Sequence, residues 1–315
     1  MEPPSQGDVV GHRRHPDVAD ALRGAGRGTF AVLDGGLSTA LEALGARPEG
    51  HLWTAQAVID QPDLVVAAHR AAVEAGADVV ISASYQASLE GFGRAGLGPR
   101  EARAALASTT QLARRAGARF VAASVGPYGA CLADGSEYHG RYDAGWNDVR
   151  GFHRRRLEVL ADTGADLVAI ETIPTVAEAV VIVEELRRVS ELPAWVSFAC
   201  ADGASLCGGE PIADAASAVA GAVQLVGVNC TPPQHVESLL EAIAAATTMP
   251  SVAYPNAGAS WDAAARCWRG VAAPVDTATA AMRWAAAGAV LIGGCCGMGT
   301  DTVAAIAAAR DAAAC

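Results

Sequence analysis

The sequence predicts a single-domain α/β fold, a (β/α)8 barrel of the TIM type, and three observations indicate it. Short apolar runs bounded by turn residues alternate with longer stretches of helical length. This alternation is typical of parallel strands joined by crossover helices. Eight such units occur in order, which favours a closed barrel over an open doubly wound sheet. No GxGxxG motif follows the first run, so dinucleotide binding has no support.

Each predicted strand is a short run rich in Val, Ile, Leu and Ala. The strands are expected at 29–34, 78–82, 119–124, 166–171, 194–198, 224–229, 251–254 and 289–293. The helices are expected at 55–75, 100–116, 149–163, 176–189, 212–220, 234–246, 277–287 and 301–313. A glycine-alanine-aspartate phrase precedes two of the strands, in EAGADVV and DTGADLV. Glycine ends the helix there, and a short turn feeds the next strand.

Composition narrows the class of protein. Hydrophobic residues make up 51% of the 315 residues and aromatic residues only 5%, so the core must be built mainly from Ala, Val, Leu and Ile. The chain carries 23 basic and 34 acidic residues, a net charge of −11. This balance argues against a nucleic-acid partner, because phosphate binding needs a positive surface. The basic run Arg154-Arg155-Arg156 is expected to be solvated or paired with acidic neighbours.

We expect residues 29–315 to form the barrel domain and residues 1–28 to be a partly disordered N-terminal extension. No apolar run reaches the roughly 18 residues of a membrane-spanning helix. The extension lacks the apolar segment of a signal peptide. A cytoplasmic protein without membrane contact is therefore expected, and the sequence leaves a homo-oligomer open.

Three cysteines in two places are the most informative residues. Cys230 follows the apolar run LVGVN, and the adjacent pair Cys295 and Cys296 follows VLIGG. If these two strands lie side by side, the three sulfurs meet at one edge of the sheet. Three thiolates leave the fourth position of a tetrahedral zinc ion open, and an open position is typical of catalytic zinc.

The alternative is that these cysteines are small apolar core residues, as most buried cysteines are. A disulfide framework is disfavoured, because a chain of this length does not need covalent staples. Adjacent residues of a regular strand point to opposite faces, so Cys295 and Cys296 reach one ion only if the strand ends before them. Gly293, Gly294 and Gly297 provide the permissive backbone for that turn.

The cysteines belong to segments by which the chain resembles the homocysteine S-methyltransferase family. These zinc-dependent barrels include S-methylmethionine-dependent enzymes, betaine-homocysteine methyltransferase and the homocysteine half of cobalamin-dependent methionine synthase. The matching segments, which span nearly the whole chain after Leu33, are LDGGLSTALEALG, LWTAQAVIDQPDLVVAAH, EAGADVVISASYQAS, SVGPYGACLADGSEYHGRY, ETIPTVAEA, VGVNCTPP, YPNAG and IGGCCGMGT. Two features depart from the family pattern. Cys131 stands where a tyrosine or similar residue is expected, and Gly-Met-Gly follows the cysteine pair where Arg or Gly with two threonines is more usual.

The resemblance implies a Zn²⁺ ion held by Cys230, Cys295 and Cys296, and methyl transfer from a sulfonium donor to the thiolate of homocysteine, which gives methionine. Zinc binding would deprotonate that thiol, whose ordinary pKa is about 8.5. In-line displacement at carbon then needs orientation and desolvation, so no residue is expected to act as a general acid or base. The implied donor is S-methylmethionine, with S-adenosylmethionine second. Betaine, a methyl-corrinoid donor, another thiol or selenol acceptor, and a non-catalytic zinc- or thiol-binding barrel are the alternatives.

The expected substrate-binding residues also follow predicted strands. Glu171 ends an apolar strand, where a carboxylate is costly unless it faces a polar cavity. The resemblance implies that Glu171 binds the ammonium of homocysteine; the alternative is a carboxylate favoured by the next helix dipole. The glycines of Asp34-Gly35-Gly36 would let backbone N–H groups approach a ligand carboxylate, although a plain turn also explains them. Asn229 is expected to orient the ligands or to satisfy buried backbone groups.

Aromatic residues near the predicted barrel mouth suit a cationic donor. They are Trp53, Tyr85, Tyr128 and Tyr138. A sulfonium over a ring face gains up to about 2 kcal/mol when desolvated, although each ring could also serve packing alone. The segment GPYGACLADGSEYHGRY adds Asp134 and Glu137 to two of these rings. Because carboxylates and ring faces both attract a sulfonium with an amino-acid tail, this loop favours S-methylmethionine over betaine.

Overall fold

The structure is a computed structural model that describes residues 30–46, 52–258, 260–262, 267–269 and 276–314. The predicted N-terminal extension, residues 1–28, lies outside the described residues.

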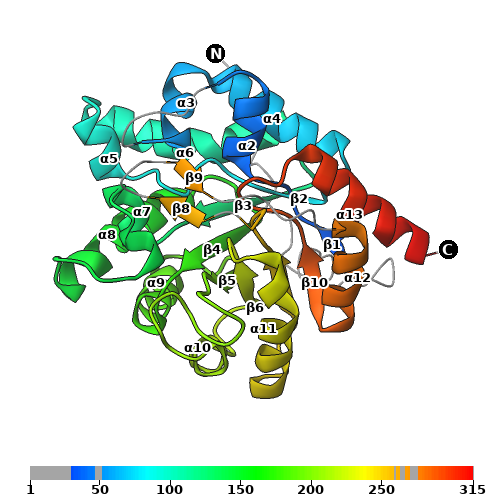
Figure 1. The fold of residues 1–315 in the computed structure, drawn as a ribbon. Helices are drawn as coiled ribbons and strands as arrows, with labels where there is room; N and C mark the ends of the chain where they lie inside the picture. Colours follow the sequence, from blue (N-terminus) through cyan, green and yellow to red (C-terminus); the bar gives the residue numbers. More distant parts are fainter. Residues whose placement is uncertain (1–29, 47–51, 259, 263–266, 270–275, 315) are drawn as a thin grey trace, which may run out of the picture.

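Eight parallel strands form a barrel at the centre of the molecule (Figure 1). They are β1 (Ala31–Val32), β2 (Val79–Ile81), β3 (Phe120–Val125), β4 (Leu167–Ile173), β5 (Ala194–Phe198), β6 (Leu225–Asn229), β7 (Ser251–Tyr254) and β10 (Ala289–Ile292). Their order is β1-β10-β7-β6-β5-β4-β3-β2, and a parallel bridge between Leu33 and Val79 joins the two ends. The closed parallel sheet confirms the predicted barrel, and each predicted strand overlaps an observed one. A small antiparallel pair, β8 (Ser260–Asp262) and β9 (Cys267–Arg269), is an addition that the sequence pattern does not predict.

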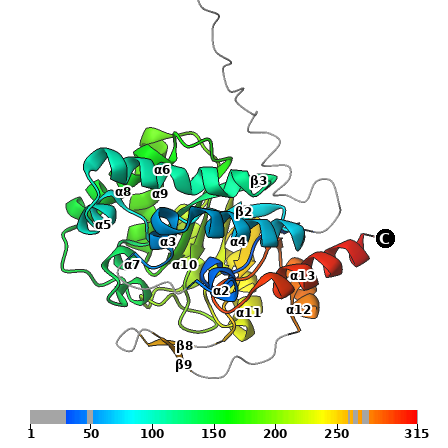
Figure 2. The same cartoon turned by 90° about the horizontal axis from the view of Figure 1, so that it is seen from above.

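Helices surround the strands (Figure 2). The longer ones are α4 (Pro62–Glu74), α6 (Pro99–Arg115), α8 (Trp146–Leu160), α9 (Val176–Val189), α10 (Ile212–Val219), α11 (Pro233–Ala246), α12 (Thr277–Ala286) and α13 (Thr300–Ala313). The shorter ones are α2 (Leu37–Ala43), α3 (Thr54–Asp60), α5 (Leu89–Arg94), α7 (Tyr128–Leu132) and the single-turn η1 (Ser136–Tyr138). Of the helices described, none is both long and apolar enough to cross a membrane.

One predicted helix is divided in two. The sequence pattern indicates a continuous helix over 55–75, whereas α3 ends at Asp60 and α4 begins at Pro62. Proline lacks an N–H and disfavours helical backbone at the residue before it, and Gln61 accordingly has a φ of −139°. The break gives the chain two short helices where one long helix is predicted.

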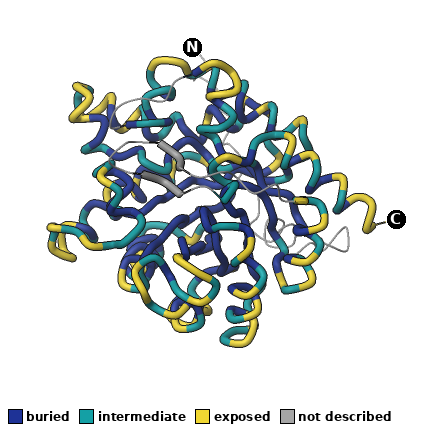
Figure 3. Tube along the Cα trace, in the orientation of Figure 1, coloured by how far each residue is buried: buried dark blue, intermediate teal, exposed yellow. Residues whose placement is uncertain are grey.

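Alternate residues of the strands belong to two different cores. In Figure 3 the strands appear as the buried centre of the molecule. One set, which includes Leu167, Trp195 and Leu291, packs inside the barrel. Its neighbours, such as Val168 and Ile170, pack against the helices. Because side chains fill the barrel interior, a ligand must bind at a strand end, where the loops leave space.

Candidate active site

A cavity of about 170 Å³ opens at the carboxyl ends of the strands. Its walls come from residues at or just after the ends of β1, β2, β4, β6, β7 and β10, together with residues of η1 and of the segment between α7 and η1. The predicted site residues that line it are Asp34, Gly35, Gly36, Trp53, Tyr85, Tyr138, Glu171, Cys230, Cys295 and Cys296. Asn229 does not line it, and neither does Tyr128. The structure thus gathers most of the predicted site residues around one space.

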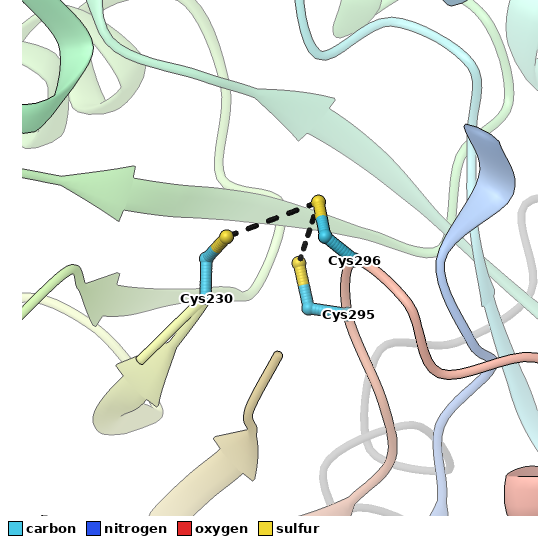
Figure 4. Close-up of side chains that lie close together, drawn as sticks. All are labelled: Cys230, Cys295 and Cys296. Atoms are coloured by element: carbon cyan, nitrogen blue, oxygen red, sulfur yellow. Dashed lines mark hydrogen bonds between the residues drawn. The ribbon is translucent and has the colours of Figure 1, made fainter. Parts of the chain in front are cut away.

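The three cysteines form a compact cluster in this cavity. Cys230 follows β6, and the pair Cys295 and Cys296 follows β10; Figure 4 shows their sulfurs close together. The Sγ of Cys296 lies 3.9 Å from the Sγ of Cys230 and 3.9 Å from the Sγ of Cys295. All three sulfurs lie within 4.8 Å of one another. A tetrahedral zinc ion with Zn–S bonds of about 2.3 Å places its sulfurs about 3.8 Å apart, so the spacing suits such an ion.

The backbone at both strand ends explains how three thiols meet. β10 ends at Ile292, before the cysteine pair, and Gly297 has a left-handed φ of 78°. The N–H of Cys295 then donates to the carbonyl of Pro255 at 2.8 Å, which fixes the pair beside the end of β7. Cys230 has a φ of 47°, and the Nδ2 of Asn256 donates to its carbonyl at 3.0 Å. The predicted ending of the strand before the cysteine pair is confirmed.

Backbone strain concentrates at this cavity. The non-glycine residues with positive φ in the described part of the chain are Trp53, Ala133, Thr172 and Cys230. All of them line the cavity. Such conformations cost roughly 1–3 kcal/mol each and persist where the surrounding structure enforces them, typically at functional sites.

In the metal-free cluster, two of the thiols stabilise the thiolate of the third. S–H donation from Cys295 and Cys296 holds the pKa of Cys230 well below its usual range. The same donation raises the pKa values of the Cys295 and Cys296 thiols. A divalent cation would replace these protons and favour three thiolates, and thiolate ligands select soft or borderline metals such as zinc.

Asp34, Gly35 and Gly36 connect β1 to the cysteine loop. The Oδ2 of Asp34 accepts from the N–H of Ile81 at 2.9 Å, and burial raises the pKa of Asp34 well above its usual range. A Cβ at Gly35 would lie 2.6 Å from the carbonyl oxygen of Met298, and one at Gly36 would lie 2.6 Å from that of Cys295. The glycines therefore allow close approach of two backbones, and the N–H of Gly36 donates to Met298 rather than toward the cavity.

Glu171 lies in β4 with its carboxylate facing the cavity, buried but for 7% of its surface. Its Oε1 accepts from the hydroxyl of Ser124. Burial and the charge of Cys295 raise the pKa of Glu171 to about 8, although hydrogen bonds from Ser124 and Tyr254 lower it. A cation beside Glu171 would restore its charged form, so the position suits an ammonium.

Tyr254 is a cavity residue that the sequence reasoning misses. Its hydroxyl lies 2.5 Å from the Oγ of Ser197 and accepts from the Nε1 of Trp195 at 3.1 Å. As the last residue of an apolar strand it has the sequence signature of a core residue, and only its place at a strand end distinguishes it.

The aromatic residues divide into two groups. Trp53, Tyr85 and Tyr138 line the cavity, and a hydrogen bond with the Tyr138 side chain helps to stabilise the thiolate of Cys230. Tyr128 instead packs edge-on against Tyr142 and Phe152. Three of the four predicted aromatic residues therefore line the cavity.

Asn229 lies behind the cavity wall. Its Oδ1 accepts from the N–H of Thr172 at 2.7 Å and from the hydroxyl of Ser197 at 2.8 Å. Its Nδ2 donates to the Oγ1 of Thr172 at 2.7 Å. Asn229 thus supports the strained backbone of Thr172, which is the second of its two expected roles.

The basic run on α8 differs in part from expectation. Arg154 and Arg155 pair with Glu185 and Glu90, as predicted. Arg156 is fully buried, and its guanidinium donates to the carbonyls of Ser84 and Tyr85 at 2.9 Å and of Gly126 at 3.0 Å. The expectation of a solvated or acid-paired side chain is wrong for Arg156. Its guanidinium instead binds the carbonyls of residues that follow β2 and β3.

The two departures from the family pattern leave the cavity intact. Cys131 lies on α7 outside the cavity wall, and its thiol donates to the carbonyl of Gln86 at 3.3 Å. In the Gly-Met-Gly segment, the N–H of Met298 donates to the carbonyl of Cys295 at 2.9 Å. The N–H of Gly297 donates to Thr39 at 2.9 Å, so this segment is tied to both the cysteine loop and α2.

The fold and the site together define a barrel enzyme whose mouth brings three thiols next to a buried carboxylate. Residues 31–310 match the family model of homocysteine S-methyltransferase. Homocysteine S-methyltransferase 1 of Zea mays is 42% identical over 306 residues, which cover 89% of this chain and 94% of the maize protein. Homocysteine S-methyltransferase YbgG of Bacillus subtilis (strain 168) is 40% identical over 293 residues, which cover 88% and 93%.

A solved structure gives the same result. The metallated form of the homocysteine methyltransferase MmuM from Escherichia coli has a TM-score of 0.81 and 36% sequence identity, covering 91% of this chain and 99% of that one. The chain belongs to the homocysteine S-methyltransferase family. The predicted assignment to this family of methyltransferases is confirmed.

Proposed function

We propose that the protein is a zinc-dependent enzyme that transfers a methyl group from S-methylmethionine to the sulfur of homocysteine. The observation that carries the proposal is the cluster of Cys230, Cys295 and Cys296 in the same cavity as the buried Glu171. Three thiolates at tetrahedral spacing suit a zinc ion with one position left for a substrate sulfur. When bound, zinc would lower the pKa of the homocysteine thiol and hold the thiolate in place.

The residues of this chain would contribute binding and orientation. Glu171 would pair with the ammonium of homocysteine, supported by Ser124 and Tyr254. Tyr85 and Tyr138 would place their rings beside the sulfonium of the donor. In the transfer, the bond from methyl carbon to the donor sulfur breaks as the bond to the homocysteine sulfur forms. The donor sulfur keeps the electron pair, so S-methylmethionine and homocysteine give two molecules of methionine and no oxidant is needed.

The family resemblance supports this function over a non-catalytic barrel. A zinc or thiol store would not need Glu171, because a buried carboxylate beside a thiolate cluster raises the cost of folding unless a cation binds it. The cavity also carries three aromatic rings, which a metal store would not need.

The test is methionine formation from homocysteine with S-methylmethionine, S-adenosylmethionine, betaine and methyltetrahydrofolate supplied in turn, with zinc measured in the same preparation. We expect about one zinc per chain and the highest kcat/KM with S-methylmethionine. A tenfold preference for betaine, about 1.4 kcal/mol in transition-state stabilisation, would reject the donor but leave the zinc-thiolate site standing. Protein that is active without bound metal would reject the zinc proposal.

A further inference from the structure

Two buried oxygen atoms without partners lie in residues of the cavity wall. Among the described residues, the buried side-chain atoms that lack a hydrogen-bond partner include Oε2 of Glu137 and Oε1 of Gln86. Of the residues that carry such atoms, only these two line the cavity. Glu137 is 8% exposed. A buried acceptor that stays unpaired costs about 1–3 kcal/mol, and more when it is charged, so two at one cavity indicate a missing donor.

The two residues belong to the same corner of the barrel mouth. The Nε2 of Gln86 donates to the carbonyl of Ala130 on α7 at 3.0 Å. Because a carbonyl can only accept, this bond fixes the amide with its oxygen free. Helix α7 packs directly against the backbone of Glu137, since a Cβ at Gly129 would lie 2.4 Å from the nitrogen of Glu137. Gln86 and Glu137 thus both contact α7, and each has one buried acceptor atom without a partner.

The chemistry of the missing group follows from these atoms. An ammonium offers three N–H donors and no acceptor, which complements a carboxylate oxygen and an amide oxygen. Burial and the charge of Asp134 raise the pKa of Glu137 to about 7, although hydrogen bonds from the backbone of Glu137 and Gly135 lower it, so a cation would stabilise its charged form. Tyr85, whose ring lines the cavity, also feels the charge of Glu137.

Glu137 and Glu171 form two separate acidic poles of the cavity, because they come from different elements of its wall. Glu171 lies in β4, where its Oε1 accepts from the hydroxyl of Ser124 in β3. Glu137 lies in η1, where its backbone packs against Gly129 of α7. Methyl transfer joins two molecules whose sulfur atoms must meet between these poles. Two amino-acid substrates bring two ammonium groups, one for each pole.

We propose that Glu137 and Gln86 bind the α-ammonium of the methyl donor, so that the enzyme requires a sulfonium donor with a free amino-acid tail. This inference rests on the proposed function, because it assumes that Glu171 holds homocysteine. In S-methylmethionine, two methylene groups separate the sulfonium from the α-carbon that carries the ammonium. This tail points away from the transferred methyl group. Betaine has no second cationic group, and its carboxylate would meet Glu137 with like charge.

The test compares donors with and without the amino group. Dimethylsulfoniopropionate has the same sulfonium and spacer as S-methylmethionine and ends in a carboxylate without an ammonium. For Glu137→Gln, we expect the KM for S-methylmethionine to rise about 10- to 100-fold, the loss of one charged hydrogen bond, while kcat/KM for dimethylsulfoniopropionate stays the same or rises. The KM for homocysteine should change less than about twofold. A thermal-shift titration with S-methylmethionine alone should show the same loss of donor binding without turnover.

Two variants serve as controls. Asp143→Asn removes an exposed carboxylate further along the same segment and should leave both KM values unchanged. Gln86→Leu removes the second acceptor and should raise the KM for S-methylmethionine by a smaller factor than Glu137→Gln. Wild-type enzyme without S-methylmethionine activity would reject the proposed donor itself. Wild-type activity with S-methylmethionine, together with an unchanged donor KM or a raised homocysteine KM in Glu137→Gln, would overturn this inference alone.

Discussion

Two buried glutamates near the segment 126–142 show how a cavity wall differs from the framework behind it. Glu178 on α9 is fully buried, and three donors satisfy it: the N–H of Tyr128, the hydroxyl of Tyr142 and the Nε2 of His153. Glu137 is nearly as buried, yet its Oε2 has no partner among the described residues. A fully bonded buried carboxylate stabilises one conformation, whereas an incompletely bonded one has an oxygen left to accept from a ligand.

The same contrast extends to other groups around the site. Arg156, which lies behind the cavity wall like Glu178, donates to three carbonyls of residues that follow β2 and β3. The thiols on the cavity side contact mainly one another, at 3.9 Å between sulfurs, and Cys230 also bonds with the side chain of Tyr138. Substitutions on the framework side should therefore change stability, and those on the cavity side should change binding and rate.

The largest effect on activity should come from the cysteine cluster. Cys296→Ser removes the sulfur that lies 3.9 Å from both of the others. We expect zinc content to fall below about one tenth of wild type and kcat/KM to fall at least a thousandfold, about 4 kcal/mol. Metal analysis and initial rates measure this, and the melting temperature of the metal-free variant should stay within about 2 °C of metal-free wild type. Full zinc retention would remove Cys296 from the ligand set.

The next prediction compares the contributions of Glu178 and Glu137 to stability. Glu178→Ala leaves the hydroxyl of Tyr142, the N–H of Tyr128 and the ring of His153 without their acceptor. We expect its melting temperature to fall by roughly 5–10 °C. Glu137→Ala removes a carboxylate that burial already disfavours, so its melting temperature should stay the same or rise. The melting temperatures of both metal-free variants, measured at pH 8, test this prediction. If both variants are destabilised equally, Glu137 contributes to stability as Glu178 does, and the proposed difference between the two is wrong.

A smaller effect on activity is expected at Glu171. Glu171→Gln should raise the KM for homocysteine about 10- to 100-fold, because an ammonium loses a charged hydrogen bond worth about 1.5–3 kcal/mol. Zinc content and the KM for the donor should change little. The pattern is the reverse of that expected for Glu137→Gln, and loss of zinc with an unchanged KM would assign Glu171 to the metal site instead.

The sequence predicts the barrel and the cysteine cluster because both depend on local patterns. Apolar runs define strands, and in a parallel barrel every strand ends at the same face, so residues after strands meet without knowledge of side-chain positions. Cys230 and the Cys295-Cys296 pair are found in this way. The break before Pro62 could also be predicted, since proline acts on the residue before it.

Tertiary contacts decide what the sequence does not predict. Arg156 belongs to a run of three arginines that looks solvated, and only the carbonyls leaving β2 and β3 make its burial favourable. The role proposed for Glu137 depends on how α7 packs against η1. Asn229 occupies a strand end like the cysteines, but its amide turns to Thr172 instead of the cavity.

The smallest effect, and the sharpest test of the unpaired carboxylate, is its pH dependence. Burial raises the pKa of Glu137 to about 7, and the groups around it, Asp134, Tyr85, Tyr138 and Tyr142, are acidic or neutral. An ammonium binds the ionised carboxylate, so the KM for S-methylmethionine should fall as the pH rises through about 7. At pH 6 it should be about tenfold higher than its limiting value, because one pH unit below a pKa leaves about one tenth of the group ionised.

Between pH 5.5 and 7.5 more than half of the donor's own α-amino group stays protonated, since its ordinary pKa is about 7.7–8.0. The homocysteine KM of the same enzyme provides the internal reference, and Glu137→Gln should have a donor KM that does not vary with pH in this range.

The ionised carboxylate of Glu137 has the opposite effect on the stability of the protein without ligand. A carboxyl whose pKa is higher in the folded than in the unfolded chain binds more protons when folded, so its contribution to stability is lost as the pH rises from about 4.5 to about 7. Glu137→Gln should therefore gain stability over wild type toward pH 8, and saturating S-methylmethionine should reduce that difference. A pH-dependent donor KM that persists in Glu137→Gln would assign the titration to another group.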